Sequence, residues 1–213
     1  MNKLATLQNT PVSNSVLGNL FPDISGKNQK VRALEKAGEI IRLKRGLYVV
    51  NPEISGTPVS TEMIANRLYG PSYVSMQTAL RYYGLIPEAV YVTQSLTVKH
   101  SRYFENAVGR FQYVSCPPDY FSIGLVQISE DVYNFVMASP EKALCDLIVN
   151  TPGLNFRYKK ELREWLEEDI RFDMDAFSQM NPEIICQCAA IGKKKNTLNL
   201  LVERLLRTTG GKN

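Results

Sequence analysis

Hydrophobic positions in the first quarter of the chain follow a helical period and then a strand period. Between residues 25 and 37 the apolar residues fall on one side of a helix with 3.6 residues per turn; they are Val31, Leu34 and Ala37. Residues 40–50 are rich in Ile, Leu and Val around Gly46, which predicts two short strands joined by a tight turn. Ser25 is the expected N-cap of the helix, and Gly38 its left-handed C-terminal residue.

Two shorter helices are expected before this one, over residues 3–8 and from Ser13 to Leu20, the latter with Ser13 or Asn14 as its cap. Three short helices followed by a hairpin are the elements of a winged helix-turn-helix. The Pro/Gly/Ser-rich stretch 51–58 then predicts a domain boundary. The expected domains are a DNA-binding winged helix-turn-helix over residues 1–57 and an α+β domain over residues 58–213.

The pattern of the second domain predicts helices first, then strands, then helices again. Ser60 and Ser72 are expected to start two helices. Apolar stretches at 90–98, 111–114, 123–128 and 132–137 predict an antiparallel sheet of about four strands, with a turn at Ser129-Glu130-Asp131. Ser139-Pro140 predicts another helix start, and the apolar stripes at 157–170 and 198–205 predict a helical C-terminal part.

Charge is distributed unevenly along the chain. The net charge is +4, and residues 1–59 carry eight Lys and Arg against four Asp and Glu, so the remainder is neutral. A basic segment attached to a neutral body is typical of a small nucleic-acid-binding unit. Within the body, residues 141–183 are net acidic and residues 184–213 net basic.

The expected DNA-binding residues are those of the third helix and the hairpin whose side chains can bond base edges or phosphates. They are Ser25, Lys27, Asn28, Gln29, Lys30, Arg32, Lys36, Arg42, Lys44 and Arg45. Lys27 and Lys30 lie on the flanks of the apolar side, which leaves two alternatives: their stems pack while their ammonium groups reach phosphates, or the helix is seated differently. Arg42, Lys44 and Arg45 are expected at or near the hairpin tip, and Tyr48 in the core.

The sequence gives no indication of catalysis, of a cofactor or of a metal site. It lacks the glycine-rich phosphate-binding motifs, the serine hydrolase elbow and the HExxH zinc motif. His100 is the single histidine and has no evident partner. The four cysteines lack zinc-site spacing and are expected to be buried thiols, and Asp173-x-Asp175 is expected to be surface acid. An enzyme of unfamiliar type stays open, because the absence of a motif is weak evidence.

Neither a membrane span nor a signal peptide is expected, which predicts a cytoplasmic protein.

Three segments in order resemble a known family. The stretches 31–48, Ala79–Ile86 (ALRYYGLI) and Ser139–Leu147 (SPEKALCDL) resemble the AbiEi-type antitoxins of abortive-infection type IV toxin–antitoxin systems, with matching order from about residue 1 to 150. The last 60 residues or so match only loosely.

The resemblance implies a repressor that binds inverted repeats in its own promoter through Lys27–Lys36 and Arg42–Arg45. It also implies an antitoxin to a nucleotidyltransferase toxin, which it need not contact directly. Inverted repeats are compatible with a homodimer on double-stranded DNA. The resemblance assigns no antitoxin residues, and the sequence does not give the operator.

A rival hypothesis is a non-catalytic protein-interaction module. In that case the winged helix binds a protein, and the opposite charges of 141–183 and 184–213 mediate pairing or partner capture.

Overall fold

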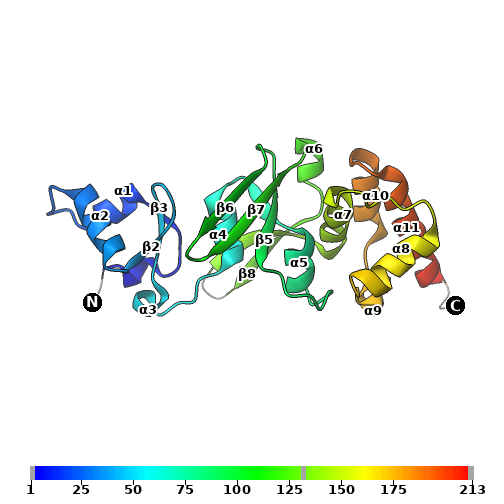
Figure 1. Ribbon diagram of the computed structural model, residues 1–213, viewed down its shortest axis with the longest axis horizontal. Coiled ribbons are helices and arrows are strands. Elements are labelled where there is room, and N and C mark those ends of the chain that lie inside the picture. The colour runs from blue at the N-terminus through cyan, green and yellow to red at the C-terminus, as the bar shows by residue number, and fades with distance from the viewer. Residues whose placement is uncertain (1–2, 131–132, 211–213) are drawn as a thin grey trace.

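The computed structural model describes residues 3–130 and 133–210 and shows an α+β chain whose parts follow one another along its long axis (Figure 1). A small three-stranded sheet with helices α1 and α2 lies at the N-terminal end. A six-stranded sheet lies in the middle, and helices α8 to α11 form the C-terminal end. The α+β fold class is therefore confirmed.

The N-terminal unit contains the expected helices and hairpin. Its elements are η1 (Ala5–Leu7), β1 (Val12–Ser13), α1 (Asn14–Asn19), α2 (Lys27–Lys36), β2 (Ile40–Lys44), β3 (Leu47–Val50) and α3 (Pro52–Ser55). Ser13 caps α1 as predicted, because its hydroxyl accepts a hydrogen bond from the backbone N–H of Val16. Gly38 and Gly46 have φ of +72° and +78°, in the left-handed region where a side chain would be strained. Strand β1, which was not predicted, pairs with β3.

Two expectations about α2 are wrong. Gly26, not Ser25, is the N-cap residue, and no side chain caps this end, so Ser25 lies exposed one residue before the cap. Ala37 is exposed because the helix ends at Lys36 and the chain turns away there. The other two apolar residues of this side are buried as predicted. Val31 and Leu34 are buried in a cluster completed by Leu4, Val12, Leu17, Ile40, Tyr48 and Val50.

The central sheet has the strand order β6-β7-β5-β4-β9-β8. Its strands are β4 (Ser72–Val74), β5 (Val92–Thr97), β6 (Arg102–Asn106), β7 (Gly109–Ser115), β8 (Leu125–Glu130) and β9 (Tyr133–Ala138). The sheet is mixed, because β5 pairs with β7 and β4 with β9 in parallel, so the predicted antiparallel sheet is wrong. The predicted turn at Asp131 and the start at Val132 lie outside the described residues.

The predicted helix start at Ser72 is also wrong. Ser72, Tyr73 and Val74 form a strand with all three residues buried between β5 and β9, and the helix begins only at Met76. A short run buried on both faces carries no alternation to mark it as a strand.

Helices cover both faces of the sheet. Tyr113 of β7 donates a hydrogen bond to Ala65 O of α4 (Thr61–Leu68), and Gln94 of β5 accepts one from the start of α5 (Met76–Tyr82). Gln94 pairs with Gln112, the neighbour of Tyr113, so α4 and α5 lie on opposite faces. Ser60 caps α4 as predicted.

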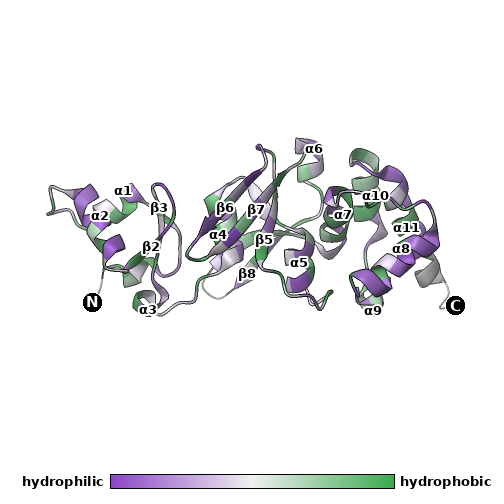
Figure 2. Cartoon of the chain, in the orientation of Figure 1, coloured by the Kyte–Doolittle hydropathy of each residue, from purple (hydrophilic) through white to green (hydrophobic). Residues whose placement is uncertain are grey.

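The C-terminal part contains α6 (Pro118–Phe121), α7 (Pro140–Asn150), α8 (Lys159–Glu164), the π-helical turn η2 (Trp165–Asp169), α9 (Met174–Ser178), α10 (Pro182–Ile191) and α11 (Lys195–Gly210). Ser139 caps α7, and the predicted stripe of Leu198, Leu201 and Leu205 is buried. Figure 2 shows α8 as mostly hydrophilic and α10 as mostly hydrophobic, although only Ile185, Cys188 and Ala189 of α10 are buried. Tyr158, predicted on the apolar side of its helix, is exposed.

Polar residues in this part have local structural roles. Asp173 accepts hydrogen bonds from the backbone N–H groups of Asp175 and Ala176, at 2.9 and 3.0 Å, and so caps α9. Cys116, Cys145 and Cys188 are buried as predicted, whereas Cys186 is exposed. No helix in the described part of the chain has the length and apolarity that crossing a membrane requires.

The boundary between residues 57 and 58 stays a prediction, and the structure shows how the segments around it meet. The larger hydrophobic cluster, mostly from residues after 58, includes Leu43 and Val49 of the hairpin. Asn106 of β6 donates a hydrogen bond to Leu43 O at 3.1 Å. The hairpin is therefore packed against the six-stranded sheet.

Candidate nucleic-acid interface

A basic cleft of about 410 Å³ lies between α2 and the β2–β3 hairpin. It is lined by Asn14, Asn28, Val31, Arg32, Arg42, Arg45, Gly46 and Tyr48. Helix α2 provides Arg32, strand β2 provides Arg42, and the turn of the hairpin provides Arg45. The fold therefore brings three guanidinium groups that are separate in the sequence to one hollow.

Arg42 is the guanidinium that the chain itself holds in place. Its Nη2 lies 2.7 Å from Glu35 Oε2, and its guanidinium carbon lies 5.9 Å from the centre of the Tyr48 ring. The hydrogen bond and charge of Glu35 raise the pKa of Arg42. These contacts set the direction of Arg42 before any ligand arrives, which lowers the side-chain entropy lost on binding.

Arg32 and Arg45 are exposed, and neither makes an ion pair within residues 3–130 and 133–210. Each guanidinium therefore keeps its five N–H donors for a ligand. Guanidinium groups suit both phosphate oxygens and the O6 and N7 acceptors of guanine.

Asn28 is held at the rim of the cleft by α1. The Asn14 side chain donates a hydrogen bond of 2.7 Å to Asn28 Oδ1. This contact leaves the amide nitrogen of Asn28 as a donor. Asn28 is exposed and Asn14 half-buried, so Asn28 can also exchange this contact for a ligand.

Lys27 and Lys30 contact α1 and the turn after it rather than the cleft. The Lys27 stem lies against Gly18, and its ammonium donates to Asn19 Oδ1 at 3.2 Å. The Lys30 ammonium lies 5.0 Å from the centre of the Phe21 ring. The Lys27 stem and the Lys30 ammonium thus both contact apolar or small groups of this segment, which favours the first of the two alternatives and explains two cations on the flanks of an apolar helix side.

The other predicted residues of α2 lie outside the cleft lining. Lys36 is exposed in the last turn. The Gln29 side chain folds toward the N-terminus of the helix, and its Oε1 lies 2.8 Å from the point where a Cβ on Gly26 would stand. Ser25 is exposed beside it.

Lys44 lies next to the hairpin turn as predicted, because it pairs with Leu47 across Arg45 and Gly46, but its side chain points to the central domain rather than into the cleft. Its ammonium donates a hydrogen bond of 2.5 Å to Leu68 O, at the end of α4. Burial, together with the charges of Lys99 and Arg102, lowers the pKa of Lys44. An irregularity in the β2–β3 register between Arg42 and Lys44 breaks the alternation that would place both on one face.

This difference between neighbours gives a prediction. Replacing Arg45 with alanine should weaken binding to duplex DNA about fivefold or more, because one exposed guanidinium of the cleft is lost. Replacing Lys44 with alanine should change that affinity less than about twofold, because Lys44 contacts α4. Fluorescence anisotropy with one labelled duplex at fixed salt compares the two. A larger loss for Lys44→Ala would contradict this placement.

A second cluster of charged groups lies buried under the sheet, and only its helix was predicted. Lys142 Nζ lies 2.9 Å from Asp146 Oδ1, and neither side chain is exposed to solvent. Asp146 Oδ2 accepts hydrogen bonds from Ser75, at 2.6 Å, and from Tyr73, at 3.1 Å. Lys142 also donates to Tyr120 O at 3.1 Å. Burial and the charge of Asp146 raise the pKa of Tyr73, so its hydroxyl keeps its proton.

The Lys142–Asp146 cluster joins β4, the start of α5, α6 and α7. Because no atom of the ion pair is accessible, a substrate cannot reach it, and its contacts are those of a structural network. Opposite charges four positions apart within the apolar run Ala143–Val149 and just before it are the sequence feature that could have indicated it.

A scan against protein-family models gives no match to this chain, and a search of curated proteins gives no matching sequence. What the chain does must therefore be argued from its residues and their contacts.

Proposed function

We propose that the chain is a DNA-binding transcriptional repressor whose residues 1–57 form a winged helix-turn-helix. In this proposal α1 and α2 are the helix-turn-helix, α2 is the recognition helix, and the β2–β3 hairpin is the wing. The observation that carries the proposal is the cleft in which Arg32, Arg42 and Arg45 meet, within the part of the chain that carries the whole net charge. A concave cationic surface between a helix and a hairpin suits a duplex backbone and groove.

Each cleft residue has a role that follows from its position. Arg32 and Asn28 lie on the exposed side of the recognition helix, where they can donate to base edges in the major groove. Arg45, in the turn of the hairpin, contacts phosphate or the minor groove beside it. Arg42, oriented by Glu35, contacts phosphate between the two.

The wider role that we propose follows the family resemblance. The chain represses its own operon by binding inverted repeats in the promoter, and residues 58–213 act as the antitoxin against a nucleotidyltransferase toxin. The antitoxin activity requires no direct contact with the toxin. No catalytic residue, cofactor or metal takes part in this proposal.

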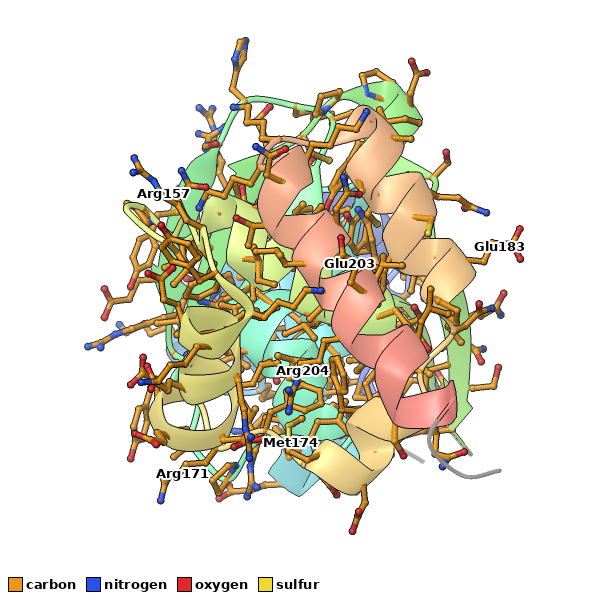
Figure 3. All side chains as sticks on the ribbon, turned by 90° about the vertical axis from the view of Figure 1, so that its right-hand side faces the viewer. Arg157, Arg171, Met174, Glu183, Glu203 and Arg204 are labelled. Carbon is orange, nitrogen blue, oxygen red and sulfur yellow. The ribbon has the colours of Figure 1, made fainter. Side chains whose placement is uncertain are left out.

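The rival, a protein-interaction module that uses the charges of the C-terminal part, has less support. Some of these charged residues pair within the chain, since Lys159 contacts Glu203, and Arg204 lies 2.9 Å from Glu167. Figure 3 labels Glu203 and Arg204 on α11. Lys194 donates to Ile148 O and Thr151 O at the end of α7, at 2.8 and 2.6 Å. The Arg204–Glu167 ion pair therefore joins the acidic segment to the basic one, and Lys194 adds two hydrogen bonds to the end of α7.

A salt titration with the DNA upstream of the reading frame tests the proposal. If one winged helix makes about three phosphate contacts, its affinity for the duplex should fall about 40-fold between about 50 and 200 mM salt. The reason is that the bound arginines displace condensed cations. A packed protein interface would change little over this range. Binding that is insensitive to salt, or no binding to the upstream duplex, would contradict a DNA-binding role.

The antitoxin part needs its own assay. The chain should rescue growth when it is co-expressed with a nucleotidyltransferase encoded in the adjacent reading frame. The full chain with Arg32, Arg42 and Arg45 all replaced by alanine should rescue equally well. A failure to rescue would contradict the antitoxin role and leave the DNA-binding result intact.

A further inference from the structure

A second group of cations lies beside the hairpin, outside the cleft. Lys44 of β2, Lys99 of the segment between β5 and β6, and Arg102 of β6 all contact the three consecutive residues 68–70 at the end of α4. We call these three cations the β6 patch. Elements that are distant in the sequence therefore bring three positive charges to one place.

The contacts of the β6 patch are made with carbonyl oxygens and aromatic rings. Lys99 Nζ donates to Gly70 O at 2.6 Å and lies 5.4 Å from the centre of the Tyr69 ring. The guanidinium carbon of Arg102 lies 5.7 Å from the same ring and 5.1 Å from the centre of the Phe104 ring. These neutral groups orient the two cations and leave their charges in place.

No carboxylate balances the β6 patch within residues 3–130 and 133–210. Glu105, the acid of β6, pairs with Arg110 at 3.2 Å, and it stands three positions from Arg102, so it lies on the opposite face of the strand. Burial, and then the charges of Lys99 and Arg102, lower the pKa of Lys44, which shows that the like charges repel one another. A surface of this kind favours an anionic ligand.

The β6 patch continues the basic cleft across the hairpin turn. Arg45 lines the cleft, while Lys44, the residue before it, turns to α4 on the other side. Asn106 of β6 donates a hydrogen bond to Leu43 O, which holds this edge of the sheet beside the hairpin (Figure 1). Positive charge therefore extends from the cleft to the central domain with one residue of backbone between the two surfaces.

We propose that the β6 patch binds the phosphate backbone of the duplex next to the site that the cleft occupies. Lys99 and Arg102 are exposed and contact phosphates, whereas Lys44 is half-buried and its ammonium stays on α4. DNA as the ligand rests on the proposed function, because the duplex is the polyanion that the cleft holds. A duplex suits cations on both sides of the turn, since its phosphates form a continuous row of charge.

The salt dependence of binding to an upstream duplex of about 24 base pairs tests the proposal. Lys99→Gln with Arg102→Gln removes two phosphate contacts, so the slope of log affinity against log salt should become shallower by about 1.8. The affinity of this double variant should fall about tenfold at about 100 mM salt. Lys160→Gln with Arg163→Gln, on exposed positions of α8, removes the same charge and should change neither quantity.

Two further readouts identify the contact as one to the backbone beside the main site. The affinity of the double variant for a scrambled duplex should fall by the same factor, because phosphate contacts carry no sequence information. Hydroxyl-radical footprinting should show that the wild type protects sugars beyond one end of the region that the double variant protects. Arg102→Glu repeats both measurements if the double variant unfolds.

The outcomes separate this proposal from the proposed function. A double variant with the affinity, salt slope and footprint of the wild type would overturn the role of the β6 patch, while a loss of affinity in Arg45→Ala would still support the cleft. A wild type that binds neither duplex would overturn both roles.

Discussion

Replacing Asp146 with alanine is expected to lower the free energy of unfolding by about 3–5 kcal/mol, the largest effect we predict for a single substitution. The change leaves the Lys142 ammonium in the core without its counter-charge, and removes the acceptor of the Ser75 and Tyr73 hydroxyls. A buried charge without a partner costs far more than the pair contributes. Urea denaturation at neutral pH, followed by circular dichroism, measures the difference.

Two controls separate loss of charge pairing from loss of packing. Tyr73→Phe removes one hydrogen bond to Asp146 and should cost about 1–2 kcal/mol. The double change Lys142→Met with Asp146→Leu removes both charges and should restore most of the stability lost in Asp146→Ala. A loss below about 1 kcal/mol for Asp146→Ala would show that the pair does not hold these elements together.

Replacing Arg32 with alanine is expected to have the second large effect, which is a loss of discrimination between DNA sequences. The difference in binding free energy between the upstream duplex and a scrambled duplex should fall by about 1–3 kcal/mol, because a guanidinium that donates to a base edge is lost. Arg32 makes no competing ion pair within the described residues, so its donors are available. Competition gel shifts with the two duplexes measure the ratio.

The control for Arg32 is an arginine outside the cleft. Arg110 on β7 is exposed and pairs with Glu105, so Arg110→Ala should leave both affinities and their ratio unchanged. Equal losses for the two duplexes in Arg32→Ala would assign Arg32 to phosphate rather than to base contact.

Helix caps and the hairpin could be predicted from neighbouring residues, because the contacts that form them are close in the sequence. The caps at Ser13, Ser60 and Ser139 were predicted correctly, because a cap bonds an N–H group only two or three residues away. The hairpin was predicted from Gly46 and its flanking apolar residues for the same reason.

Elements that depend on distant partners were missed. Strand β4 exists because β5 and β9 lie on either side of it, and β9 is more than 50 residues away. Strand β6 carries Arg102 and Glu105, so its composition gave no strand signal, and its pairing with β7 stabilises it.

The candidate site was predicted in part. Arg32, Arg42, Arg45 and Asn28 line the cleft, but the sequence could not separate them from Lys27 and Lys30, which pack toward α1. The contact of the Lys44 side chain with α4 was not predicted, because the break in strand register that directs it there has no sequence signal here. The Lys142–Asp146 network was missed because its hydroxyl partners come from β4 and the residue after it.

Nuclear magnetic resonance of the full chain, titrated with its upstream duplex, is the most direct test of the central claim that α2 and the hairpin bind DNA. The largest chemical-shift changes on adding DNA should occur in the backbone amides of residues 27–50 and in the guanidinium Nε–H signals of Arg32, Arg42 and Arg45. Shifts confined to residues 58–210, with these three arginines unchanged, would contradict it.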